Sequence, residues 1–167
     1  MEIRRGTEAD VPFISRIESL CFPPAEAASY QSFVRRMGIY PEGFWLCVED
    51  GETVAFVNGM ESDAYDLSDD MYENNTLYKK GGEWEVILSV ATLPEKRGKG
   101  YARALLRKAI ADTAARGKRG LVLTCKKGLI GFYESVGFVN EGLSESKHGG
   151  AEWYQMRLFC GENSAER

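Results

Sequence analysis

Apolar and polar positions follow two periods along the chain, and the two periods predict strands and helices. Short apolar or alternating runs predict strands at 2–5, 44–49, 53–59, 84–92, 121–125 and 153–159. Apolar positions at helical spacing predict helices from residue 11 onward, over 29–37, from 101 to about 117, and over 129–136. The predicted order is therefore one strand, two helices and three strands, followed by helix, strand, helix and strand, with no linker or repeat between them.

Two local signals sharpen these predictions. The segment from Thr7 to Asp10 resembles a capping box, and Val11 opens an apolar series at helical spacing after it. Asp50 and Gly51 separate two predicted strands, and an Asp-Gly pair in that position indicates a tight hairpin. We expect a helix to start just before Val11 and a two-stranded hairpin at Asp50-Gly51.

The most informative segment lies between the strand 84–92 and the helix that begins near 101. Gly98 and Gly100 allow backbone N–H groups to converge on an anion, and the following helix start adds unsatisfied donors and partial positive charge. Arg97, Lys99 and Arg103 add full charges. The spacing fits neither the Walker loop nor the dinucleotide Gly-x-Gly-x-x-Gly loop. The segment thus predicts a phosphate site of another kind, although Gly-Lys-Gly can also be a simple turn before a helix.

A second segment follows at residues 121–138. A buried strand over 121–125 leads into a short helix that ends at Gly137 and is followed by Phe138. This helix carries Tyr133 in the run Phe-Tyr-Glu-Ser-Val-Gly-Phe. On helical spacing alone, Tyr133 could simply pack on the core.

Together these motifs resemble the GNAT superfamily of acyl-CoA N-acyltransferases. Its pyrophosphate motif corresponds to Arg97-x-x-Gly100-x-Ala102, and its Phe-Tyr-x-x-x-Gly-Phe element corresponds to residues 132–138. The resemblance implies an α/β (α+β) fold, a mixed central β-sheet flanked by helices, with a splayed strand pair that forms an acyl-CoA notch. It also implies that Tyr133 is the general acid toward the leaving thiolate. The implied acetyl-CoA-binding residues are Val90, Ala91, Thr92, Arg97, Gly98, Lys99, Gly100, Tyr101, Ala102, Arg103 and Tyr133.

Within the superfamily, the chain is similar to the arylalkylamine (serotonin) N-acetyltransferase group from about residue 17 to 159. Support comes from residues 21–29, which resemble that group's flexible substrate loop, and from a long insert over 61–82. The resemblance implies substrate contacts by Phe22, Pro23 and Glu26. The carboxylates and aromatic residues of the insert could bind an amine, or could form a solvated loop.

The chain departs from that group on the central strand. The positions that match the two proton-relaying histidines of the animal enzymes are Val86 and Leu88. A protonated amine must lose its proton before attack, so a route for that proton is required: a carboxylate, an ordered water chain, or uptake of the rare neutral amine. Glu85 on the same strand and His148 near the end of the chain are the candidate catalytic bases. The alternatives are an ordinary strand carboxylate for Glu85 and a polar loop residue for His148.

Composition limits the classes of function. The net charge of −4 argues against a general nucleic-acid binder, and basic residues gather instead around the predicted phosphate loop. A single histidine and four scattered cysteines argue against a bound metal, and we interpret the cysteines as small buried apolar residues. No apolar run is long enough for a membrane span, and the first residues lack the apolar run of a signal peptide, so a cytoplasmic location is expected.

The sequence therefore predicts a single N-acetyltransferase domain over residues 1–167. It would transfer an acetyl group from acetyl-CoA to a primary amine, preferably a small arylalkylamine, by direct attack in a ternary complex. A protein or peptide N-acetyltransferase and a non-catalytic acyl-CoA sensor are the alternatives. The expected partners are the amine and acetyl-CoA, without nucleic acid, membrane or metal, in a monomer or homodimer. The acceptor's identity and the acyl length are not fixed by the sequence.

Overall fold

The computed structural model of the protein describes residues 1–161. Its strands and α-helices agree with most of the predicted ranges, and short 3-10 turns join several of them. In chain order the elements are β1 (Glu2–Arg5), η1 (Glu8–Asp10), α1 (Val11–Cys21), α2 (Tyr30–Ile39), η2 (Pro41–Gly43), β2 (Phe44–Glu49), β3 (Glu52–Ser62), α3 (Asp70–Glu73), β4 (Trp84–Thr92), η3 (Pro94–Lys96), α4 (Tyr101–Ala115), β5 (Gly120–Cys125), η4 (Lys127–Leu129), α5 (Ile130–Val136), β6 (Val139–Leu143), η5 (His148–Gly150) and β7 (Tyr154–Phe159).

The strands form a seven-stranded sheet in the order β1-β2-β3-β4-β5-β7-β6. The sheet is mixed, because β4 and β5 are parallel whereas the pairs β1–β2, β2–β3, β5–β7 and β6–β7 are antiparallel. The chain divides into two compact units, each made of two stretches: residues 1–60 with 88–109, and residues 61–87 with 110–167. We describe the two units separately as unit 1 and unit 2.

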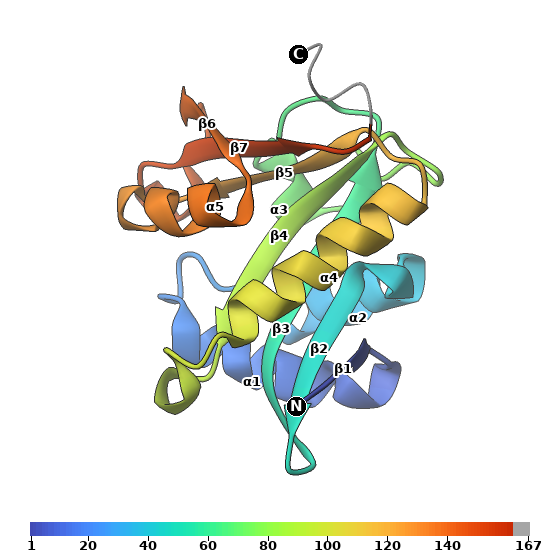
Figure 1. Ribbon diagram of the computed structural model, residues 1–167, viewed down its shortest axis with the longest axis vertical. Coiled ribbons are helices and arrows are strands. Elements are labelled where there is room, and N and C mark those ends of the chain that lie inside the picture. The colour runs from blue at the N-terminus through green and yellow to red at the C-terminus, as the bar shows by residue number, and fades with distance from the viewer. Residues whose placement is uncertain (162–167) are drawn as a thin grey trace. The chain divides into compact units, whose positions relative to one another are not determined.

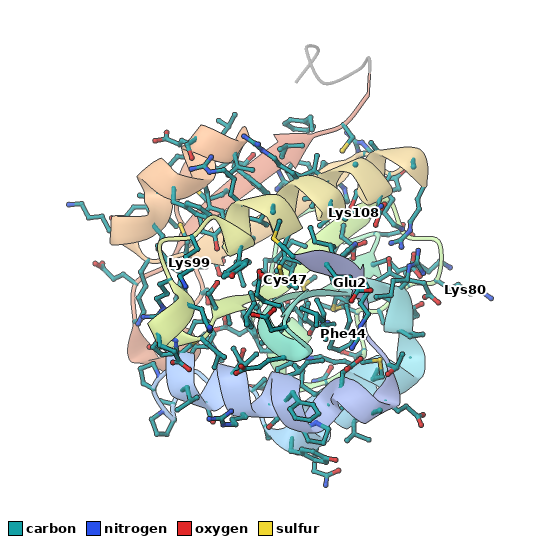
Figure 2. All side chains as sticks on the ribbon, turned by 60° about the horizontal axis from the view of Figure 1, so that its bottom comes forward. Glu2, Phe44, Cys47, Lys80, Lys99 and Lys108 are labelled. Carbon is teal, nitrogen blue, oxygen red and sulfur yellow. The ribbon has the colours of Figure 1, made fainter. Side chains whose placement is uncertain are left out.

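Unit 1 is built on the antiparallel strands β1, β2 and β3, which lie side by side (Figure 1). Helices α1 and α2 pack against each other, and Phe33 of α2 meets Phe44 and Phe56 edge to face at ring-centroid distances of 6.3 and 5.8 Å. Phe44 and Cys47 lie on β2 among the interior side chains, whereas Lys99 lies on the loop before α4 (Figure 2). These aromatic contacts form the apolar core of unit 1.

Both local signals in unit 1 are confirmed. Asp10 accepts hydrogen bonds from the Thr7 N–H at 2.8 Å and the Thr7 hydroxyl at 3.0 Å, and it pairs with both terminal nitrogens of Arg4 at 2.8 Å. Asp50 and Gly51 have positive φ values of 51° and 77°, as a tight hairpin with both central residues left-handed requires.

Unit 2 contains the parallel pairing of β4 with β5, where Trp84 lies opposite Gly120 and Val86 opposite Val122. Strand β7 pairs with β5 on one side and β6 on the other, and α5 packs on β6 and β7 (Figure 1). Trp84 packs edge to face on Phe159 at 5.8 Å. The helix α5 ends at Gly137, whose φ of 112° is the left-handed cap that the sequence predicts.

The insert of residues 61–82 belongs to unit 2, and ion pairs tie it to the rest of that unit. Asp66 pairs with the fully buried Arg157 of β7 at 3.0 Å, and the buried Glu61 pairs with Lys118 at 2.7 Å. The ring of Tyr65 lies 3.6 Å from the Arg157 guanidinium carbon. The insert's carboxylates therefore serve mainly to hold the insert in place.

Two elements were missed and several ends differ from the prediction. Strand β6 exposes Val139 and Leu143, so its residues lack the alternation of a half-buried strand, and α3 is one short turn within the insert. Helices α4 and α5 and strand β7 are each shorter than predicted by one or two residues, whereas α2 and β3 extend further. A single domain over 1–167 stays a prediction, and residues 162–167 lie outside the described part.

Candidate functional site

The predicted phosphate loop has the backbone that anion binding needs. Gly98 and Gly100 adopt left-handed φ values of 80° and 86°, and no atom lies within 4 Å of a Cβ built on either residue. Arg97 and Lys99 are exposed on the same loop, and Arg103 is half-buried on the first turn of α4. A loop of this kind leaves both backbone donors and cationic side chains facing solvent, which suits a phosphate ester.

The start of α4 is fixed to the sheet of unit 1. The buried Tyr101 donates its hydroxyl to Glu49 of β2 at 3.0 Å. Leu105, Leu106 and Ala109 are fully buried, which confirms the predicted apolar stripe of this helix. Tyr101 thus has a structural task, namely to hold the helix N-terminus in place behind the loop.

The end of β4 carries Val90, Ala91 and Thr92, of which Ala91 is buried and the other two are half-buried. The Thr92 carbonyl accepts a hydrogen bond from the Cys21 thiol at 3.0 Å. A carbonyl oxygen has two lone pairs, so the Thr92 carbonyl can still accept a bond from a ligand.

The predicted substrate loop follows α1 in the same unit. Phe22 is half-buried, Pro23 is exposed, and Glu26 is buried within a turn in which its N–H and that of Ala27 donate to the Pro23 carbonyl at 2.8 and 2.9 Å. The structure therefore brings Phe22, Pro23 and Glu26 into one compact turn.

Glu18 is a residue that the sequence reasoning missed. It is only 3% exposed and accepts a hydrogen bond from the Ala28 N–H at 2.9 Å through one oxygen, while the other oxygen has no hydrogen-bond partner among residues 1–161. Burial raises the pKa of the Glu18 carboxyl, against opposing effects of Ala28, the Ser89 hydroxyl and Arg36. Glu18 lies at helical spacing from Val11 and Ile14, so the sequence puts a carboxylate on the apolar face of α1. This pattern could have identified Glu18 as a buried carboxylate.

Tyr133 lies on α5 in unit 2 and is 6% exposed. Its ring packs edge to face on Phe132 at 5.1 Å and on Phe138 at 5.8 Å. Burial raises the pKa of the Tyr133 hydroxyl well above its usual value, and interactions with Cys125 and Tyr72 raise that pKa further. A hydroxyl in this setting keeps its proton at neutral pH, as a general acid must.

His148 lies in the short turn η5 and is stacked on Tyr72 of the insert. The two ring centroids are 4.1 Å apart and the planes differ by 9°. Trp153 lies on the same cluster at 5.9 Å from His148 and donates its indole N–H to the His148 carbonyl at 2.8 Å. His148 is half-buried in this cluster and is not an exposed loop residue.

Glu85 occupies a different environment. It is fully buried on β4 and pairs with Arg116 at 3.4 Å. An ion pair of this kind gives the carboxylate a structural role in unit 2, and its predicted role as a base stays a prediction.

Two of the four cysteines match the interpretation as small buried apolar residues, whereas Cys21 and Cys160 are half-buried. Cys47 and Cys125 are buried in strands, and burial raises the pKa of the Cys125 thiol to about 11. Across residues 1–161 no three His, Cys, Asp or Glu side chains are grouped to hold a metal ion. In the same range no helix has the length and apolar character to span a membrane.

Comparison with solved structures supports the fold. The chain is similar to the GphF GNAT-like decarboxylase in complex with isobutyryl-CoA, with a TM-score of 0.83 and 18% identity over 95% of this chain and 99% of that one. It is also similar to Ard1 from Thermoplasma volcanium (TM-score 0.75, 19% identity, 96% and 98% covered). A third similar structure is the ribosomal-protein-S18-alanine N-acetyltransferase from Escherichia coli (TM-score 0.69, 21% identity, 97% of each chain covered). These structures confirm the predicted α/β fold.

Sequence comparison supplies the family. No curated protein sequence matches the chain. The profile of the acetyltransferase (GNAT) family, however, matches residues 11–138, a range that includes both the glycine loop and the helix of Tyr133. On this match and the shared fold, the chain belongs to the GNAT family of acyl-CoA-dependent acetyltransferases.

Proposed function

We propose that this GNAT enzyme transfers an acetyl group from acetyl-CoA to a primary amine by direct attack of the amine on the thioester. The observation that carries the proposal is the loop of residues 97–103, in which two left-handed glycines, exposed cations and a helix start occur together. This combination suits the pyrophosphate of coenzyme A.

The chain offers a group for each part of the cofactor. Arg97, Lys99 and Arg103 would neutralise the pyrophosphate, and backbone N–H groups of the loop would bind its oxygens. The backbone of Val90 to Thr92 would pair with the pantetheine arm. We assign the Val90 N–H as the donor that polarises the thioester carbonyl.

Tyr133 would act as the general acid. When the amine attacks, the carbon–sulfur bond breaks and the leaving thiolate takes a proton, which the buried Tyr133 hydroxyl still holds at neutral pH. The buried Cys125 thiol, with a pKa of about 11, is a poor nucleophile at neutral pH, so direct transfer is favoured over an acyl-cysteine intermediate at this residue.

The amine must also lose protons, and His148 and Glu85 are the proposed acceptors. Of the two, His148 is better supported, because it is half-buried between the rings of Tyr72 and Trp153. Glu85 is already paired with Arg116. An imidazole can accept a proton at one ring nitrogen and donate one from the other, which suits proton transfer.

For the acceptor we propose a small primary amine of the arylalkylamine type. Phe22 and Pro23 would form its apolar wall and Glu26 would attract its ammonium group, since all three lie in one turn. We assign the insert a smaller part in amine binding than its acidic composition suggests, because the carboxylates of Asp66 and Glu61 are engaged in ion pairs. A cytoplasmic location and the oligomeric state stay predictions.

A protein N-terminus is the second candidate acceptor. Solved structures with this fold include an S18-alanine N-acetyltransferase and a Naa20 bound to a bisubstrate analogue. The amine in such substrates is also primary, and the chemistry proposed for Tyr133 and the loop is the same.

A thiol-release assay with acetyl-CoA tests the proposal. The acceptor panel should include arylalkylamines, polyamines, amino acids and peptides with free N-termini. We expect cationic arylalkylamines to outcompete anionic amino acids. Acetylation of peptides alone would replace the small-amine proposal by the second candidate. Tight coenzyme A binding without turnover on any acceptor would favour an acyl-CoA sensor.

A further inference from the structure

We infer that Tyr72, which comes from the insert between β3 and β4, is a positioning residue for His148, the proposed proton acceptor of unit 2. This inference rests on the proposed function of His148. It assigns to the insert a part in the reaction that its sequence does not indicate.

The ring of Tyr72 holds the imidazole of His148. The two rings are nearly parallel, with centroids 4.1 Å apart, and Trp153 approaches His148 from a second direction at 5.9 Å. The Trp153 indole also fixes the backbone of His148 by its hydrogen bond to the carbonyl. These contacts restrict the orientation of the imidazole, and a proton acceptor acts best when its orientation is fixed.

The hydroxyl of Tyr72 reaches the opposite side of the cluster. It shares a hydrogen bond of 3.1 Å with the Thr124 hydroxyl on β5, next to Cys125. Tyr72 therefore stacks directly on His148 and is itself held by a hydrogen bond to β5.

The position of Tyr72 depends on contacts made by its neighbours in the insert. It lies on α3, a helix of four residues, which is too short to be stable by itself. Asp69, just before this helix, accepts hydrogen bonds from the Ser146 hydroxyl at 2.5 Å and from the Lys147 N–H at 2.9 Å. These bonds tie the insert to the segment that carries His148, so the stacked pair is held from both sides.

An NMR experiment on the full-length chain can test the contact without an assay. His148 is the single histidine of the sequence, so the imidazole C–H signals report on this residue alone. We expect the ring-current shift of these signals to persist in Tyr72→Phe, which keeps the ring, and to shrink in Tyr72→Leu, where only the more distant Trp153 ring remains. Tyr65→Leu is a matched control, because Tyr65 is an insert tyrosine that stacks on Arg157 and has no ring contact with His148.

Steady-state kinetics with the best acceptor complete the test. In Tyr72→Leu we expect kcat to fall between about tenfold and 10²-fold, the size expected for a misplaced catalytic group, with the KM for acetyl-CoA unchanged. Tyr65→Leu should retain the wild-type kcat. If Tyr72→Leu does not fold, Tyr72→Phe and Thr124→Val each remove the same hydrogen bond, and their effects on kcat should not add in the double variant.

The outcomes separate this inference from the proposed function. An unchanged His148 signal or wild-type kcat in a folded Tyr72→Leu variant would overturn the positioning role alone. Additive losses in the Tyr72→Phe and Thr124→Val pair would also contradict it. If the wild-type protein acetylates no acceptor, the proposed function fails, whatever the NMR signals do.

Discussion

The imidazole of His148 lies flat against the ring of Tyr72, with 4.1 Å between centroids and 9° between planes, although 76 positions of sequence separate them (148 − 72). Tyr72 belongs to an insert with no family motif, and His148 belongs to a polar turn. Together with Trp153, this contact places the candidate base His148 in an ordered aromatic cluster.

Tyr133→Phe separates chemistry from packing at the proposed acid. The variant keeps the buried ring and its contacts with Phe132 and Phe138, so stability and coenzyme A affinity should barely change. General acid assistance contributes roughly 10²–10⁴-fold, and because a thiolate leaves readily we expect a loss in kcat near the lower end. Steady-state kinetics with both substrates saturating measure this loss. Wild-type turnover in the folded variant would make Tyr133 a core aromatic only.

Gly100→Val should weaken coenzyme A binding. The backbone at Gly100 has a φ of 86°, which a β-branched residue adopts only with strain, and the added side chain would obstruct the approach of a pyrophosphate to the loop N–H groups. We expect affinity to fall at least about tenfold, or 1.4 kcal/mol. Gly51→Val is the matched control, since Gly51 is also left-handed, at 77°, but lies in the β2–β3 hairpin. Calorimetry in which both variants bind like the wild type would refute the pyrophosphate assignment.

The free energy of unfolding of Glu18→Gln, relative to that of the wild type, should increase as the pH rises. The folded state raises the pKa of the Glu18 carboxyl, so the wild type loses stability from the ordinary glutamate value of about 4.3 upward, until the pH passes the folded pKa. Glutamine keeps an acceptor for the Ala28 N–H and carries no charge. Urea unfolding at several pH values measures the difference, with the exposed Glu52→Gln as control. If the difference in free energy of unfolding between the wild type and Glu18→Gln does not vary with pH, this account is wrong.

For Asp10→Asn, the stability difference from the wild type should depend on pH in the opposite sense to that of Glu18→Gln. The hydrogen bonds from Arg4, together with those from Thr7, lower the pKa of the Asp10 carboxyl in the folded state. Its stabilising effect is complete above the ordinary aspartate value of about 3.9 and is lost as the pH falls through the lower folded value. At neutral pH we expect the variant to be less stable by about 1 kcal/mol, as for other helix caps. Thermal unfolding monitored by circular dichroism between pH 7 and strongly acidic pH tests both the size and the direction.

The sequence by itself determined the features that depend on neighbours along the chain. The Asp50-Gly51 hairpin, the Thr7–Asp10 box and the left-handed Gly137 cap follow from backbone preferences of single residues, and all three are present. The family fold was also predictable, because the glycine loop and the Tyr133 helix are short, ordered motifs. Such signals are readable from sequence because their energetics are local.

The tertiary structure decided how the polar residues are used. Glu85 was a candidate base by sequence, and its burial beside Arg116 depends on packing between β4 and the segment after α4. Glu18 was hidden among apolar positions, and strand β6 was missed because an exposed edge strand needs no buried face. The stacking of Tyr72 on His148 could not be read from the sequence either. Ion pairs and ring contacts between residues far apart in the chain form only when the whole fold brings them together, and no local pattern encodes which partner each side chain will meet.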